Sequence, residues 1–383
     1  MLDEMANQLM DEMISHRRNL HRIPELGFQE YKTQEYILRN IRDFVDEYKI
    51  LAKTGVVGFL NNGSERTVLL RADMDGLPIK EENDVDYKSV HEGVMHACGH
   101  DSHMAVLISL VKYFYSNRKD LRVNLRYMFQ PAEEGLGGAK AMIEEGVLED
   151  VDFALAIHVW NELEYGKIAL GCGPTMASSD SFEVEIIGKG AHAATPSLAV
   201  DPILTSSLFI NQVYTVFPRV FKDYVVSFTY INAGSANNII PESCFIKGTV
   251  RSFDEDTRKR IAGVFEKNLR DVCSSTGATY VLKYDFGYPV LVNDHRLYEI
   301  GIKVASEIVG KENIQNFRSY GSEDMAFVLQ KVPGLYVAIG SGIGNPHHSP
   351  KFNINENSML NAFKFLKNMV FEIQLLPQYS LNS

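Results

Sequence analysis

The sequence predicts an α/β fold: one domain with a mostly parallel sheet flanked by helices, plus an inserted ferredoxin-like α+β domain. Apolar strand-like runs alternate with helical stretches in the outer parts of the chain, which favours a sheet with helices on both faces. Residues 178–290 instead show a β-α-β-β-α-β order, typical of the split ferredoxin-like arrangement. At 383 residues the chain also exceeds the usual size of a single core. We therefore expect a discontinuous domain, 1–177 with 291–383, and an inserted domain at 178–290.

The outer segments begin with a helix, because residues 3–22 carry apolar positions at helical spacing before "RIPELG" supplies a proline and a glycine. Four later runs are almost continuously apolar, which is typical of strands buried on both faces. These expected strands lie at 67–73, 122–129, 153–158 and 334–340. The expected helices lie at 103–117, 138–146 and 297–310.

The middle segment has a different pattern. Residues 181–190 alternate between apolar and polar with a period of two, which indicates a strand with one solvated face. Further strands are expected at 225–234, 244–253 and 279–287, with helices at about 201–217 and 254–275. This order predicts an antiparallel sheet with two helices on one of its faces.

The composition of the chain argues against several classes of protein, among them nucleic-acid-binding and membrane-spanning proteins. The net charge of −11 opposes binding to nucleic acid, and no run approaches the roughly 18 apolar residues of a membrane span. The acidic start "MLDEMANQLMDEM" lacks the features of a signal peptide. The cysteines are widely spread without a CxxC pair, so we expect a cytoplasmic protein in which Cys172, Cys244 and Cys273 are small core residues.

Polar residues that can bind metals follow several of the predicted strands. They are Asp73 and Asp75, Cys98 and His100, Glu133 and Glu134, His158, and His347 and His348. Taken singly, each has a structural explanation, such as a turn cap, an acid in the first turn of a helix or a core histidine. Together they offer thiolate, imidazole and carboxylate at the ends of separate strands, the ligands that a borderline-soft divalent metal takes.

The number of candidate ligands predicts two ions. Cys98, His100, one glutamate of the 133–134 pair, His158 and one histidine of the 347–348 pair exceed what a tetrahedral ion accepts, and a bridging Cys98 thiolate would serve both ions. Two ions lower the pKa of a shared water to about 7, which favours hydrolysis. The other glutamate is expected to be the general acid/base. Asp75 is expected to accept the free N–H of a ligand histidine.

At these residues the sequence resembles the aminoacylase and hippurate-hydrolase family of two-metal amidohydrolases, which includes indole-acetyl-amino-acid hydrolases and N-acetyldiaminopimelate deacetylases. The resemblance covers nearly the whole chain. Its motifs follow in family order: "RRNLHRIPELGFQE", "LRADMDGLPI", "HEGVMHACGHDSHMAV", "FQPAEEGLGGAKAMIEEG", "HVWNELEYGKI", "GKGAHAATP", "ANNIIPE", "GSEDMAF" and "HHSPKFNINE".

Carried over residue by residue, the resemblance implies metal ligands at Cys98, His100, Glu134, His158 and His348, and a general base at Glu133. It also implies that His192 stabilises the oxyanion, often in the partner subunit's site. Asn238 and Arg251 are candidates for binding a substrate carboxylate, although Arg251 fits a solvated strand face equally well. Glu164 stands where the family commonly has proline. His96, His103 and His347 match no ligand position, so we expect these three histidines to support ligands or to pack against helices.

The resemblance implies a metal-dependent amidohydrolase that cleaves an acetyl or aromatic acyl group from an amino acid. A metallo-carboxypeptidase or dipeptidase, or an N-acetyldiaminopimelate deacetylase, is the alternative within the same chemistry. A non-catalytic dimeric binding protein is the alternative from another class, and the presence of all the candidate ligands and of Glu133 argues against it. The expected partners are a small N-acyl amino acid or short peptide and a second copy of the chain, in a homodimer or a higher homo-oligomer built through the inserted domain.

The expected cofactor is a pair of divalent metal ions. Zn²⁺ suits a site with thiolate and imidazole ligands, whereas Mn²⁺, Co²⁺ or Ni²⁺ would fit a five-coordinate site with carboxylate.

Overall fold

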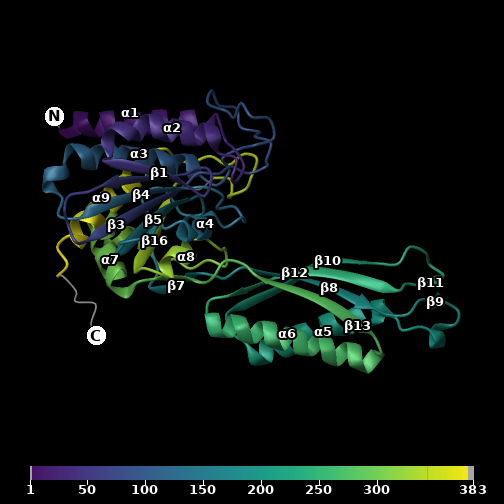
Figure 1. Cartoon of the computed structure of the whole chain (residues 1–383). Coiled ribbons are helices and arrows are strands. Elements are labelled where there is room, and N and C mark those ends of the chain that lie inside the picture. Colours follow the sequence, from purple (N-terminus) through teal and green to yellow (C-terminus); the bar gives the residue numbers. More distant parts are fainter. Residues whose placement is uncertain (1, 343, 378–383) are drawn as a thin grey trace. The chain divides into compact units, whose positions relative to one another are not determined.

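The computed structural model describes residues 2–342 and 344–377, and the chain divides into two compact units (Figure 1). The first unit comprises Met1–Gly173, Val292–Arg318 and Asp324–Ser383. The second comprises Pro174–Leu291 and Ser319–Glu323. Among the described residues, no helix combines the length and the apolar character that crossing a membrane requires.

The first unit is built on an eight-stranded sheet with the order β1-β2-β4-β3-β5-β16-β6-β15. Its four central strands, β4, β3, β5 and β16, run parallel, while β1 pairs antiparallel with β2, β2 with β4, and β6 with β16. The bounds are β1 Glu47–Leu51, β2 Gly55–Leu60, β3 Thr67–Asp73, β4 Asn124–Gln130, β5 Phe153–Trp160, β6 Ile168–Ala169, β15 Ile314–Gln315 and β16 Gly334–Gly340.

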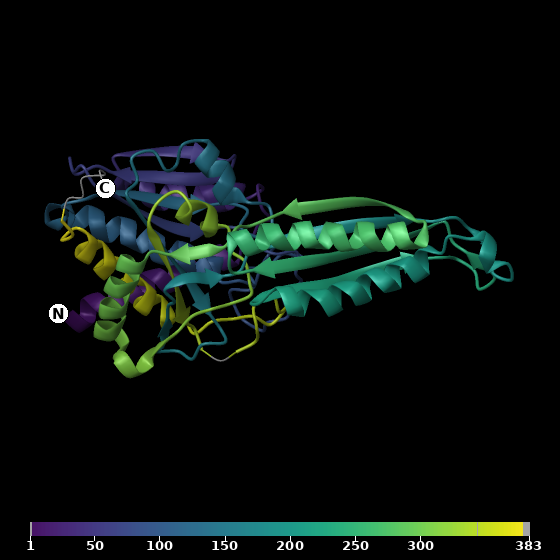
Figure 2. The ribbon, with the colours of Figure 1, turned by 90° about the horizontal axis from the view of Figure 1, so that it is seen from below.

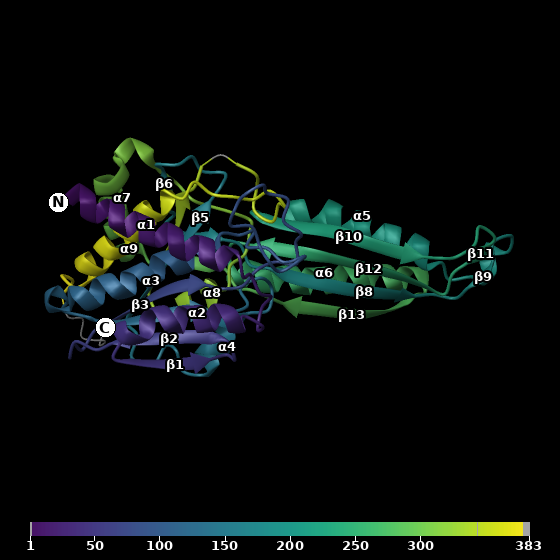
Figure 3. The ribbon, with the colours of Figure 1, turned by 90° about the horizontal axis from the view of Figure 1, so that it is seen from above.

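Helices flank this sheet, and Figures 1 and 3 show α1, α2 and α3 together on one of its faces. The helices of the unit are α1 Leu2–His21, α2 Tyr31–Ile41, α3 His100–Ser116, α4 Gly138–Glu144, α7 His295–Val309, α8 Met325–Leu329 and α9 Ser358–Ile373. Short 3₁₀ turns lie at Arg42–Phe44, Arg118–Asp120 and Lys311–Asn313. α3 is apolar almost all round and almost entirely buried, so it lies between β3, α1 and α9.

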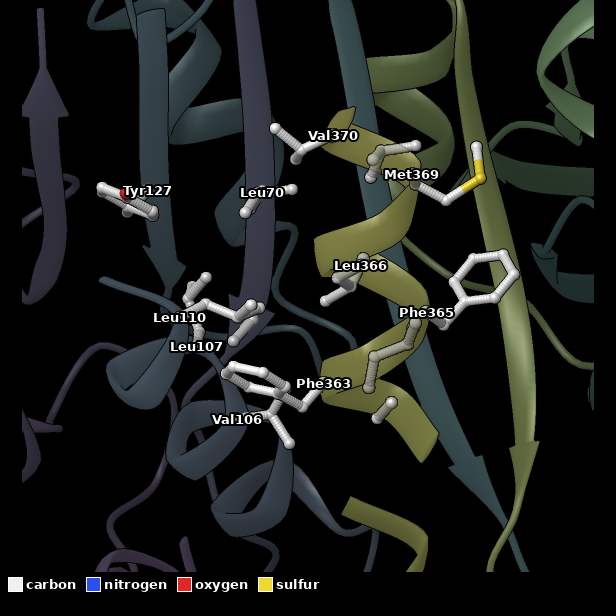
Figure 4. Close-up of a cluster of buried hydrophobic side chains, with 14 of the residues drawn as sticks. Leu70, Val106, Leu107, Leu110, Tyr127, Phe363, Phe365, Leu366, Met369 and Val370 are labelled. Atoms are coloured by element: carbon white, nitrogen blue, oxygen red, sulfur yellow. The ribbon is translucent and has the colours of Figure 1, made fainter. Parts of the chain in front are cut away.

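The main core lies between α9, α3 and the central strands. Figure 4 shows Phe363 and Leu366 pointing from α9 toward α3 and β3, where they meet Leu70 and Leu107. Phe365 points to the opposite side of the same helix. All these side chains are at most 3% exposed, which explains why the sequences of β3 and β16 are almost continuously apolar.

The second unit has a four-stranded antiparallel sheet with the order β10-β12-β8-β13, which is the ferredoxin-like order. Its strands are β8 Asp180–Ile187, β10 Tyr224–Ala233, β12 Ser243–Ser252 and β13 Thr279–Phe286. The helices α5 Pro202–Val220 and α6 Glu255–Thr276 lie side by side along the sheet (Figure 2). Alternate residues of β8, such as Phe182, Val184 and Ile186, are buried in a second core with Phe209 and Phe265.

Smaller elements complete the chain. β9 Ala191–His192 pairs with β11 Ile239–Ile240, and β7 Gly173–Met176 pairs with β14 Leu291–Asn293. A further 3₁₀ turn lies at Pro196–Leu198.

The predicted α/β fold class with a ferredoxin-like second part is confirmed, and the predicted strands at 67–73 and 334–340 match β3 and β16 to the residue. One core assignment was wrong. Cys244 and Cys273 are buried, but Cys172 is exposed, because it lies in the short segment between β6 and β7 rather than within a packed strand.

Candidate metal centre

The candidate ligands gather at one edge of the sheet of the first unit. β3, β4, β5 and β16 are parallel neighbours, so their carboxyl ends meet at the same edge. His158 lies on the last part of β5, Glu133 and Glu134 follow β4, and the loop that carries His348 follows β16. Cys98 and His100 lie at the N-terminus of α3. The structure therefore brings together all five residues for which the sequence predicted metal ligation.

The ligand atoms form overlapping groups. Within each group the atoms lie within 4.8 Å of one another: Cys98, His100 and His158 form one group, and Cys98, Glu134 and His348 form another. The Cys98 Sγ is 3.5 Å from His158 Nε2, and His348 Nε2 is 3.3 Å from Glu134 Oε1. Cys98 is common to both groups, which is the arrangement that a bridging thiolate requires. A further group contains His100, Glu133 and Glu134.

A glycine between Cys98 and His100 permits the sharp turn into α3. Gly99 has a φ of +89°, in the left-handed region that side chains disfavour. A Cβ atom there would lie 2.3 Å from Cγ2 of Val159, the neighbour of His158 in β5. The missing side chain therefore lets the turn approach β5 closely, which brings Cys98 to His158.

The loop that carries the two glutamates is held in an unusual backbone conformation. Ala132 has a φ of +55°, and its N–H donates to the buried carboxylate of Glu30 at 2.9 Å. Gly138, at the start of α4, lies so close to the loop that a Cβ atom there would be 1.7 Å from the carbonyl oxygen of Pro131. These contacts direct Glu133 and Glu134 toward the candidate ligands.

Hydrogen bonds fix the orientation of two of the histidines. His100 Nδ1 donates to the carbonyl oxygen of Asp75 at 2.9 Å, and His158 Nδ1 donates to the carbonyl oxygen of Val159 at 2.6 Å. In both rings Nδ1 carries a proton, so Nε2 is the nitrogen with which each ring would bind a metal. Among the described residues, buried His100 Nε2 and Glu134 Oε1 have no hydrogen-bond partner. Buried polar atoms without a hydrogen-bond partner, beside a thiol and a further imidazole, fit a site for a cation.

Asp75 contacts two of the candidate ligands, Glu134 and His100. Its Oδ2 accepts from the backbone N–H of Glu134 at 2.9 Å, and its Oδ1 lies 3.3 Å from His100 Nδ1. The sequence predicted that Asp75 supports a ligand histidine through its carboxylate. In the structure the hydrogen bond from His100 goes to the backbone carbonyl of Asp75, with the carboxylate beside it.

Burial and nearby charges shift the pKa values of three of the candidate ligands. Burial disfavours charge on His100, but the carboxylates of Asp73, Asp75 and Glu134 outweigh burial and raise the pKa of His100 to about 10. Burial and the same acidic surroundings raise the pKa of the Cys98 thiol well above its ordinary value. Burial among other histidines lowers the pKa of His158 well below its usual range. A divalent cation would balance this negative charge.

A charged network beneath the ligands was not assigned from the sequence. Arg71, in the middle of β3, donates to Gln130 at 2.8 Å, to Asp73 at 2.7 Å and to Asp324 at 3.0 Å. All four side chains are fully buried or nearly so. Two features of the sequence could have indicated this network. Arg71 is a charged residue inside the apolar strand "TVLLRAD", and Asp324 lies in "GSEDMAF", a motif to which no role was assigned above.

The histidines without a ligand position differ from one another. His103 donates from Nδ1 to Asp73 at 2.6 Å, and His347 donates from Nε2 to the carbonyl oxygen of Val159 at 3.0 Å. His96 is buried, and neither of its ring nitrogens has a hydrogen-bond partner among the described residues. Burial lowers the pKa of His96 to about 4, so it packs as a neutral ring.

The other candidate site residues belong to the second unit. His192 in β9 pairs with Ile239 in β11, and the backbone of Asn238 accepts from Ala193 at 3.0 Å, so His192 and Asn238 lie together. Both are exposed. Arg251 lies at the far end of β12 from this segment and donates to Ser322 Oγ at 3.0 Å. Within the unit, therefore, Asn238 and Arg251 do not form one carboxylate-binding group.

Comparison with known proteins places this geometry in a family. Residues 69–372 match the profile of peptidase family M20/M25/M40. The chain is 36% identical over 366 residues to thermostable carboxypeptidase 2 of Saccharolobus solfataricus, covering 92% of this chain and 93% of the relative. It is 39% identical over 298 residues to an N-acyl-L-amino acid amidohydrolase of Geobacillus stearothermophilus, covering 76% and 80%.

A solved structure agrees with these relatives. The Bacillus subtilis YxeP protein, a dinuclear metal-binding peptidase from the M20 family, superimposes with a TM-score of 0.85 at 30% identity, over 96% of this chain and 99% of that one. The resemblance to two-metal amidohydrolases is thereby confirmed. The chain belongs to peptidase family M20/M25/M40, whose members hydrolyse amide bonds.

Proposed function

We propose that this protein is a metal-dependent amidohydrolase that releases free amino acids from N-acyl amino acids, with an acetyl or aromatic acyl group. The observation that carries the proposal is the position of Cys98, which belongs to two ligand groups, while Glu133 belongs to a third group with His100 and Glu134. The similarity to an N-acyl-L-amino acid amidohydrolase supports the substrate class.

Two divalent ions fit the residues present. Cys98, His100, Glu134, His158 and His348 would hold them, with Cys98 shared, and Zn²⁺ or Mn²⁺ suits this donor set. When bound, such a pair polarises a carbonyl oxygen and lowers the pKa of water to about 7. The similarity to a dinuclear metal-binding peptidase supports the number of ions.

Glu133 is the proposed general acid/base. It adjoins Glu134 in the loop after β4, and its side chain is buried at this edge of the sheet. A carboxylate that is not itself a ligand accepts the proton of the attacking water and returns it to the nitrogen of the leaving amine. Asp75 would support this step indirectly, since it holds the backbone of Glu134 and the ring of His100.

The second unit is proposed to act as a lid and a dimerisation domain. His192 would stabilise the oxyanion that forms as water adds to the amide carbonyl. Asn238 and Arg251 would bind the substrate carboxylate. Assembly into a homodimer and a cytoplasmic location stay predictions.

A carboxypeptidase or dipeptidase is the second candidate, supported by the 36% identity to thermostable carboxypeptidase 2. Both reactions break an amide bond next to a free carboxylate, so the same catalytic groups would serve. The two candidates differ in the group on the carbonyl side of the bond: a simple acyl group in one case and an aminoacyl group in the other.

A substrate panel tests the proposal and separates the candidates. Purified protein is assayed with N-acetyl amino acids, N-benzoyl amino acids and dipeptides, with and without chelator and added divalent ions, while bound metal per chain is counted. Chelator-sensitive release of amino acid from N-acyl substrates is the expected result. Preferential cleavage of dipeptides would establish the second candidate. A folded, metal-loaded protein that cleaves no panel member would contradict both.

A further inference from the structure

The end of β5 extends beyond the strand beside it. The pairing of β3 with β5 stops at Arg71 and Ala156, whereas β5 continues to Trp160. Ala154 N–H bonds toward β16, and the carbonyl oxygen of Trp160 accepts from Ser341 after β16. Because successive residues of a strand direct their backbone groups to alternate sides, the N–H and C=O of Val159 point toward the side that β3 has left uncovered.

Side chains take the place of the missing strand. His103 Nε2 accepts from the N–H of Val159 at 2.9 Å, and His103 Nδ1 bonds Asp73 Oδ1 at 2.6 Å. A ring nitrogen that accepts an N–H bond carries no proton, so the ring proton of His103 lies on Nδ1 and points to the Asp73 carboxylate. Arg71 in turn holds the other oxygen of Asp73 at 2.7 Å. The orientation of the His103 ring is therefore fixed on both sides.

Val159 also contacts the candidate ligand His158. The carbonyl oxygen of Val159 accepts from His158 Nδ1 at 2.6 Å. This contact keeps the proton of His158 on Nδ1 and leaves Nε2 bare, 3.5 Å from Cys98 Sγ. A buried N–H and C=O without partners would cost free energy, so the position of Val159 depends on the groups that satisfy it.

We propose that Asp73 and His103 are positioning residues that act through the backbone of Val159 to fix the metal-binding tautomer of His158. This inference rests on the proposed function, because it assigns the purpose of the His158 orientation to metal binding. It differs from the direct pairing of a ligand histidine with a carboxylate, since here the backbone N–H and C=O of Val159 lie between the two imidazoles.

Packing alone is the competing explanation. The rings of His103 and His158 are 4.6 Å apart at their centroids, so His103 also fills space beside the ligand. The two explanations predict opposite rankings of two variants. Phenylalanine at 103 keeps a ring but has no acceptor, whereas glutamine lacks the ring but offers an oxygen to the N–H of Val159.

The experiment reads the tautomers directly in chelator-treated protein. Protein labelled with ¹⁵N-histidine gives long-range ¹H–¹⁵N spectra that show which ring nitrogen carries the proton. In the unsubstituted protein, His103 and His158 are both expected to carry their ring proton on Nδ1. In His103→Phe, His158 is expected to show a mixture of tautomers, and in His103→Gln the Nδ1 form is expected to persist. His16→Phe, which removes a buried histidine elsewhere in the first unit, is the control.

Zn²⁺ affinity, measured by competition with a coloured chelator, gives a second readout. His103→Phe is expected to weaken one Zn²⁺ site by about 10- to 100-fold, with His103→Gln close to the unsubstituted protein. A His158 proton on Nε2 in the unsubstituted protein overturns the proposal even if no variant folds. So does an unchanged tautomer and affinity in His103→Phe. Neither readout involves a substrate, so the absence of turnover would count against the proposed function alone.

Discussion

The carboxylate of Glu30 holds the backbone of Ala132, with Glu30 Oε1 accepting from the Ala132 N–H at 2.9 Å. Glu30 is fully buried, and its second oxygen accepts from Thr54 Oγ1 at 2.5 Å. Ala132 is in the left-handed region with a φ of +55° and directly precedes Glu133. A residue at the start of α2 thus stabilises the strained backbone that presents the proposed general base.

Glu30→Ala is expected to lower kcat more than it raises KM, because Glu133 would lose its fixed position while substrate contacts remain. The buried Ala132 N–H would be left without an acceptor, at a cost of about 1–3 kcal/mol in the free energy of unfolding. Steady-state kinetics and urea unfolding measure the two effects. Glu30→Gln retains an acceptor and is the matched control. Equal kinetics for the alanine and glutamine variants would show that this hydrogen bond does not position Glu133.

Glu133→Ala is expected to retain both metal ions and lose hydrolysis by a factor of about 10² to 10⁴, the usual contribution of a general acid/base. Metal content per chain and turnover of the preferred substrate are measured on the same preparation. Cys98→Ala is the companion variant and should lose metal as well as activity. An active Glu133→Ala enzyme would remove Glu133 from its proposed role.

Gly99→Ala is expected to reduce the metal content and to destabilise the fold by more than about 1 kcal/mol, since the new Cβ meets both a left-handed φ and the side chain of Val159. Gly93 provides a matched control. Its φ is +79°, but a Cβ there would meet no atom within 4 Å. Gly93→Ala should therefore show the backbone cost without losing metal. If both variants bind metal normally, the turn between Cys98 and His100 tolerates a side chain.

Acid is expected to destabilise the first unit through Asp101. Burial opposes its charge, but Arg17, at 2.9 Å, and His21, at 2.8 Å, hold the pKa of Asp101 far below its usual value. A carboxyl with a lowered folded-state pKa contributes stability that is complete above its unfolded-state pKa of about 4 and is lost as the pH falls below it.

Urea unfolding of metal-free protein between pH 3 and 7 measures this loss, in a range set by the unfolded pKa of about 4. Asp101→Asn should flatten the acid limb and cost about 3–5 kcal/mol at neutral pH, because it leaves Arg17 buried without its charged partner. The exposed pair Asp46 and Arg118 offers the control, and Asp46→Asn should cost less than about 1 kcal/mol. A similar cost for both variants would contradict the buried-pair explanation.

The sequence predicted the parts of the fold that periodicity encodes. The strands that become β3 and β16 are almost continuously apolar, and β8 alternates between apolar and polar residues, so the sequence shows which of their faces are buried. The hairpin of β1 and β2 was not predicted. β1 is exposed along almost its whole length, because it is an edge strand and lacks the apolar pattern of a central one. Helix α9 was not predicted either.

The sequence predicted which residue types would bind metal, but it did not predict the residues that hold these ligands in position. Cys98 and His100 stand out because thiol and imidazole are rare and close in sequence. No local sequence pattern of this kind distinguishes Glu30, Arg71 and Asp324, since their role depends on contacts between segments up to 253 residues apart. Hydrogen bonds of that range follow from the sheet order, which no local pattern encodes.

The sheet order of the first unit also dictates when the protein can mature during synthesis. β16 inserts between β5 and β6, so the central sheet gains its fourth parallel strand only after residue 340 has been translated. Most of the second unit, Pro174–Leu291, leaves the ribosome well before that point. A nascent chain therefore carries Cys98, His100, Glu134 and His158 with an open sheet edge and without His348. Metal capture by the nascent chain would be incomplete until His348 has been translated.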